Sequence, residues 1–153
     1  MRQLPDGQRW LDFFAEVYDL YRKSGMKPAL ERFSGAFVES DRQVLAARAR
    51  VDGESRYAAA NAAYWFEHEL RQYPAVELDV DALRAHAGRI QLMGGHESHG
   101  RPAYEVNVQL GRKLGQEVLE LPGGHLGCVA HPAEFAHELV RALEARSPKE
   151  QEP

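Results

Sequence analysis

The first half of the chain places its apolar residues with the period of an α-helix. Between residues 8 and 23, apolar side chains recur at spacings of three and four: Trp10, Phe13, Phe14, Val17, Leu20 and Tyr21. One apolar face with this period predicts a helix. Ser24-Gly25 predicts its end, because glycine accepts the left-handed conformation that follows a last turn. A second helix is expected to begin near Pro28 and to carry the apolar residues Ala29, Leu30, Phe33 and Phe37.

Further helices are expected before residue 88. Residues 39–56 are charged and lack aromatic side chains, so they favour only a short helix from Gln43 to Arg50 and a turn at Asp52-Gly53. A clear helix is predicted from Tyr57 to Gln72, and a short one from Val80 to Ala87.

The second half changes to short segments separated by glycine. Residues 89–93 predict a strand that ends at Gly94-Gly95, residues 102–114 a helix closed by Gly115, and residues 117–121 a second strand. Strand, helix and strand within about 33 residues form a βαβ unit with parallel strands. Pro132 opens a last helix, whose inward residues are expected to be Phe135, Ala136, Leu139, Val140 and Leu143, and the tail after Ser147 is expected to fray.

The composition narrows the class of protein. The 153 residues are 44% hydrophobic and 27% charged, which is typical of a soluble globular chain. A net charge of −4 without a basic block argues against nucleic acid as a partner. No stretch approaches the roughly 20 apolar residues that cross a bilayer, and the single cysteine, Cys128, suits a reducing compartment. We expect a cytoplasmic protein that does not insert into membranes.

The strongest candidate for chemistry is the segment Leu121-Pro-Gly-Gly-His125-Leu-Gly127. In parallel sheets, catalytic groups gather just past the carboxyl ends of the strands. His125 follows the second predicted strand at this edge, with glycines on both sides that leave its imidazole uncovered. Such an imidazole can take a proton from a nucleophile and return it to a leaving group. The alternative is a histidine in an ordinary surface loop.

At these residues the chain resembles the C-terminal part of the α/β-hydrolase superfamily, in which the histidine after the last strand is the general base of the catalytic triad. The resemblance implies an α/β fold with three parts: a helical lid over residues 1–87, a parallel βαβ unit with a C-terminal helix over 88–146, and a tail over 147–153. It implies hydrolysis of a small acyl substrate, an ester or thioester, with no cofactor.

The chain departs from the family pattern in two places. Ser98 stands where the family has its acid, so the neighbouring Glu97 is the candidate acid; a solvated loop glutamate is the alternative. No serine stands in the Gly-x-Ser-x-Gly elbow that carries the family's nucleophile. Cys128 is expected to be a buried or half-buried structural thiol. The chain alone should therefore be inactive, and a non-catalytic binding module derived from a hydrolase is the rival interpretation.

Candidate substrate-binding residues are Tyr64, Trp65, His96, Ser98 and Leu126. For the two aromatic residues, packing in a helical core is the alternative. His96, Glu97 and His99 with His125 offer ligand types for zinc but no second anchored pair, so no metal site is expected.

Two parallel strands do not make a stable sheet alone, so the free edge of strand 89–93 needs cover. It could pair with a second copy in a homodimer, bind a separate N-terminal hydrolase segment, or lie beneath the lid helices.

Overall fold

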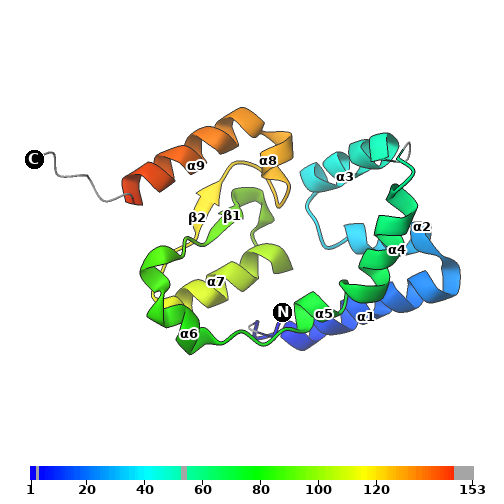
Figure 1. Cartoon of the computed structure of the whole chain (residues 1–153), viewed down its shortest axis with the longest axis horizontal. Coiled ribbons are helices and arrows are strands. Elements are labelled where there is room, and N and C mark those ends of the chain that lie inside the picture. Colours follow the sequence, from blue (N-terminus) through cyan, green and yellow to red (C-terminus); the bar gives the residue numbers. More distant parts are fainter. Residues whose placement is uncertain (3, 53–54, 147–153) are drawn as a thin grey trace, which may run out of the picture.

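The computed structural model describes residues 1–2, 4–52 and 55–146. The described chain is mostly helical, with one small sheet of two parallel strands. Figure 1 shows α1–α5 on one side of the molecule and the sheet with α6–α9 on the other. The expected turn at Gly53 and the tail after Ser147 lie outside the described residues.

Five helices make up the described part of the first half: α1 (Gly7–Ser24), α2 (Met26–Ser34), α3 (Glu39–Asp52), α4 (Ala58–His68) and α5 (Gln72–Ala75). The end of α1 is as predicted, since Gly25 follows it with a φ of 88°. The apolar faces of α1, α2 and α4 meet in a core of Phe14, Val17, Ala29, Phe66 and Leu70.

The boundaries of three helices differ from expectation. α3 is longer than the predicted segment 43–50, because Glu39 and Asp41 place carboxylates in its first turn, where the positive end of the helix dipole stabilises them. The predicted helix 57–72 is divided into α4 and α5, and Pro74 lies inside the short α5. Phe37 lies beyond the end of α2 rather than on it.

The second half contains α6 (Val80–Ala85), η1 (Ala87–Arg89), β1 (Met93–Gly95), η2 (His96–Ser98), α7 (Pro102–Leu114), β2 (Leu119–Leu121), α8 (Gly127–Ala130) and α9 (Pro132–Arg146). The strands are parallel, with Met93 opposite Leu119 and Gly95 opposite Leu121. α7 connects them as predicted and ends at Gly115 in the left-handed conformation. The sheet lies between α7 and α9 (Figure 1).

The first strand lies further along the chain than predicted. Arg89 belongs to η1, and the strand begins at Met93 and includes the two glycines that were expected to end it. Both glycines stand where a side chain has no room. A Cβ on Gly95 would lie 2.0 Å from the Gly124 carbonyl oxygen, and one on Gly94 would lie 2.6 Å from the Tyr104 ring. Close packing, rather than turn formation, explains these glycines.

Two expectations about burial near the C-terminus are wrong. Val140 and Leu143 of α9 are 50% and 51% exposed rather than turned into a core, because the close contacts of the described part of this helix are with β2 and α8. Cys128 is exposed. The buried cluster of this half is formed by Leu92, Leu110 and Leu114. No helix in the described ranges is both long enough and apolar enough to cross a membrane.

Candidate functional site

Two loops meet at the carboxyl ends of the paired strands. η2 follows β1, and the turn that carries His125 follows β2. The Glu97 N–H donates to the Gly123 carbonyl oxygen at 3.1 Å, and His96 Nδ1 lies 3.2 Å from the Leu121 carbonyl oxygen. The backbone therefore holds the two loops together at the edge where the sequence places its candidate residues.

His125 is an exposed residue in the turn between β2 and α8, whose glycines Gly123, Gly124 and Gly127 are buried. Its ring centroid is 5.7 Å from that of Phe37, which comes from the segment before α3. Within the described ranges, no hydrogen bond occupies either ring nitrogen.

A buried carboxylate that the sequence analysis missed fixes the backbone of this turn. Asp41 of α3 is only 2% exposed. Its Oδ2 accepts the His125 N–H at 2.9 Å, and its Oδ1 accepts the Leu126 N–H at 2.7 Å. A Cβ on Gly124 would lie 2.5 Å from either carboxylate oxygen, so this glycine makes room for the contact. No local pattern around Asp41 points to a partner 84 residues away in the chain.

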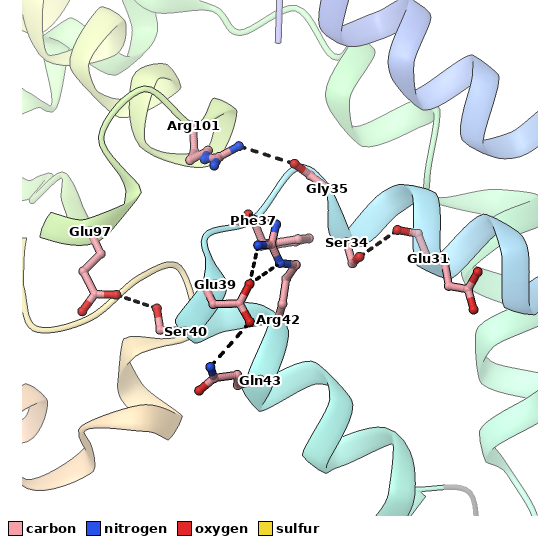
Figure 2. A network of polar contacts seen from close by, with 10 residues as sticks. All are labelled: Glu31, Ser34, Gly35, Phe37, Glu39, Ser40, Arg42, Gln43, Glu97 and Arg101. Atoms are coloured by element: carbon pink, nitrogen blue, oxygen red, sulfur yellow. Dashed lines mark hydrogen bonds and ion pairs between the residues drawn. The ribbon is translucent and has the colours of Figure 1, made fainter.

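Glu97 turns toward α3. Figure 2 shows its side chain meeting Ser40, whose hydroxyl donates to Glu97 Oε2 at 2.5 Å. In the same view the Arg101 guanidinium donates to the Gly35 carbonyl oxygen at 3.4 Å. The loop after β1 is thus tied to the segment that enters α3. No hydrogen bond among the described residues joins Glu97 to His125.

A cavity of about 250 Å³ opens beside β1. Its lining includes Met93, Ser98, Tyr104, His125 and Phe135. Ser98 is 3% exposed, and its Oγ has no hydrogen-bond partner among the described residues. The structure therefore brings two of the sequence candidates, Ser98 and His125, to the same cavity.

A polar cluster lies on the face of the sheet that α7 covers. The Tyr104 hydroxyl donates to Glu120 Oε1 at 2.8 Å, and His99 Nε2 lies 2.7 Å from the same oxygen. Burial and the neighbouring carboxylate raise the pKa of Tyr104 to about 12. The bonds from Tyr104 and then His99 lower the pKa of Glu120. These groups hold the loop after β1 against β2.

The remaining candidates lie elsewhere. Tyr64 is 59% exposed on α4, and Trp65 packs edge-on against Phe33 with ring centroids 4.9 Å apart. Leu126 lines a separate cavity beside α2 and α3, and His96 is exposed. Among the described residues, no three His, Cys, Asp or Glu side chains converge as metal ligands.

No known protein-family model matches the chain. The assignment of a function therefore depends on the residues and the geometry described above.

Proposed function

We propose that the chain is the C-terminal part of an α/β-hydrolase-like protein, in which His125 is the general base for hydrolysis of an ester or thioester. The observation that carries the proposal is the exposed imidazole in the turn after β2 of a parallel β1–α7–β2 unit, beside a cavity. The helices of residues 1–87 would act as the lid. Their position supports this role, because α3 contacts the histidine turn through Asp41.

In the proposed reaction, a serine hydroxyl attacks the acyl carbonyl while His125 takes its proton. The imidazole then returns that proton to the leaving oxygen or sulfur as the tetrahedral intermediate collapses. The 153 residues contain no Gly-x-Ser-x-Gly elbow, so the nucleophile and the oxyanion donors would come from another polypeptide segment. Glu97 would have to leave Ser40 before it could orient the imidazole.

The test is hydrolysis of p-nitrophenyl acetate and p-nitrophenyl octanoate by native protein, by His125→Ala and by His137→Ala, which removes an exposed histidine of α9. The chain alone should give the same background rate in all three forms. Combined with the polypeptide encoded directly upstream, if that segment carries a serine elbow, native protein and His137→Ala should be active and His125→Ala should lose at least about 100-fold. Activity that survives His125→Ala in this combination would refute the proposal.

A second function, a non-catalytic binding module, is favoured by one observation. The candidate acid, Glu97, is hydrogen-bonded to Ser40, and no carboxylate among the described residues is hydrogen-bonded to the imidazole. A module of this kind would bind a small acyl compound in the cavity without consuming it. Octanoate should then raise the midpoint of thermal unfolding while its concentration stays constant; an unchanged midpoint at about 1 mM would exclude it.

A further inference from the structure

Four polar side chains line the cavity beside β1, and they differ in what they bind. The Tyr104 hydroxyl and the Asn107 amide donate hydrogen bonds to other groups of the chain. The Ser98 hydroxyl and the His125 ring have no hydrogen-bond partner among the described residues. A molecule in the cavity would therefore meet two groups whose bonding capacity the rest of the described chain does not use.

The Ser98 hydroxyl is the more unusual of these two groups because it is buried. Ser98 is 3% exposed in η2, and its Oγ has no partner among the described residues. A buried hydroxyl without a hydrogen bond costs free energy, and almost all such groups in native proteins have a partner. No contact within the described fold explains a hydroxyl at this position. Its burial against the cavity points to a partner that enters from outside.

The two groups lie at different depths. His125 is exposed, as is Met93, so these residues mark the mouth of the cavity. Ser98 and Leu121 are each 3% exposed and mark its inner end. The side chain of Phe135 adds an apolar surface to the lining. A matching molecule has an apolar body with one polar group at the mouth and a second polar group at the inner end.

The volume of the cavity limits the size of such a molecule. It is about 250 Å³, below the range of about 300–1,000 Å³ that is usual for drug-sized ligands. One water takes about 30 Å³ of liquid volume, so the cavity holds the equivalent of about eight waters. This space suits a short acyl compound and excludes a bulky one.

We propose that the cavity binds a short acyl compound that carries a hydroxyl group on its acyl chain, and that Ser98 forms a hydrogen bond with this hydroxyl. The placing of the acyl carbonyl at His125 rests on the proposed function, whereas the contact with Ser98 does not require catalysis. On binding, the Ser98 side chain adopts the staggered rotamer that presents Oγ to the ligand. Ser98 is then the residue that determines specificity at the inner end.

The test compares two esters of the same shape, methyl 3-hydroxybutanoate and methyl 3-methylbutanoate, in which a methyl group replaces the hydroxyl. Each is added up to about 10 mM to isotope-labelled native protein, and the dissociation constant is taken from the shifts of amide resonances. The shifts should centre on Gly94, Gly95 and Gly124, which line the cavity. The hydroxy ester should bind at least about fivefold more tightly than its methyl counterpart.

Ser98→Ala removes the proposed partner and should abolish this preference. The methyl counterpart should then bind at least as tightly as the hydroxy ester, because the hydroxyl would lose water without gaining a hydrogen bond. Ser24→Ala, at an exposed serine outside the cavity, is the matched control and should keep the native preference. Without ligand, Ser98→Ala should unfold no more than about 2 °C below native protein, since the hydroxyl has no partner within the described fold.

Three results would overturn the proposal. Equal affinity of native protein for the two esters is the first, and it needs no variant that has to fold. A preference that survives Ser98→Ala is the second. A larger loss of stability in ligand-free Ser98→Ala is the third, because the hydroxyl would then be satisfied inside the fold, by a buried water. Ester hydrolysis with the upstream polypeptide is measured separately, so failure of the proposed catalysis is recognised independently of these results.

Discussion

Removal of the Asp41 carboxylate should loosen the histidine turn and destabilise the whole chain. Asp41 is 2% exposed and accepts two backbone N–H groups, at 2.9 and 2.7 Å. Hydrogen bonds to a charged acceptor contribute about 1.5–3 kcal/mol each. Water can reach part of the turn once the carboxylate is gone, because His125 is exposed. We therefore expect Asp41→Ala to lower the free energy of unfolding by about 3 kcal/mol, the low end for two such bonds. Asp41→Asn, which keeps one acceptor oxygen, should lower it by about 1–2 kcal/mol.

The loss is measured by urea unfolding and by thermal unfolding. For a chain of this size, about 3 kcal/mol corresponds to a fall of about 6–12 °C in the unfolding midpoint. Asp19→Ala is the matched control, because Asp19 is an exposed aspartate on α1. Hydrogen exchange should also accelerate at the amides of His125 and Leu126. An Asp41→Ala midpoint within about 2 °C of that of Asp19→Ala would refute the reasoning.

A double-mutant cycle isolates this contact. Gly124→Ala places a Cβ 2.5 Å from both Asp41 oxygens, and its three nearest neighbours are all atoms of Asp41, so it should destabilise the native chain by about 1–3 kcal/mol. In the Asp41→Ala background the obstacle is gone, and the same substitution should be almost neutral. Strict additivity of the two changes would show that Gly124 is constrained by something other than the carboxylate.

Other predictions concern the core, one turn and alkaline pH. Phe66→Ala should lower the free energy of unfolding in urea by about 3–5 kcal/mol, because Phe66 is 1% exposed and stacks on Tyr21. A loss as small as that caused by Tyr64→Ala, at an exposed position, would contradict the assigned core. Gly115→Ala should lower the free energy of unfolding by about 1 kcal/mol, because the φ of Gly115 is 68°, a left-handed value that strains alanine. A variant more stable than native protein would mean that residue 115 does not adopt this conformation. The pKa of Tyr104 is raised from 10.0 to about 12. The protonated Tyr104 hydroxyl therefore contributes its full share of stability below pH 10, and this share is lost as pH rises toward 12. Thermal midpoints of native protein should fall over this interval more steeply than those of Tyr104→Phe, and parallel curves would disprove the assignment.

The helices could be predicted from the sequence wherever their signals are local. The apolar period of α1 and the glycine after it lie within one segment, and the same holds for α7, with Pro102 at its first position and Gly115 after its last. Such signals depend on neighbours in the chain rather than on the tertiary fold. The position of His125 in a turn after a parallel strand was predicted for the same reason, from the order of strand, glycines and helix.

The details that depend on tertiary packing could not be predicted in this way. Gly94 and Gly95 belong to β1 because the Tyr104 ring and the Gly124 carbonyl approach them, and both partners are remote in sequence. Asp41 lies in a charged segment whose composition resembles an ordinary solvated helix face. Its role becomes visible only when α3 meets the histidine turn. Periodicity predicts an apolar face for α9 but not what covers it, and the structure leaves Val140 and Leu143 of that face exposed.

The contacts that join the two halves of the molecule gather at the candidate site. Each half has an apolar cluster of its own, while polar contacts from Gly35, Ser40 and Asp41 reach the loops after β1 and β2. If α1–α5 act as the proposed lid, their separation from the sheet would break these polar contacts and the Phe37–His125 ring contact, and would leave both apolar clusters intact. Because Asp41 bonds to the backbone of His125 itself, such a movement would also release the turn that holds the imidazole. In the proposed hydrolase, the position of the base is thus coupled to the position of α3.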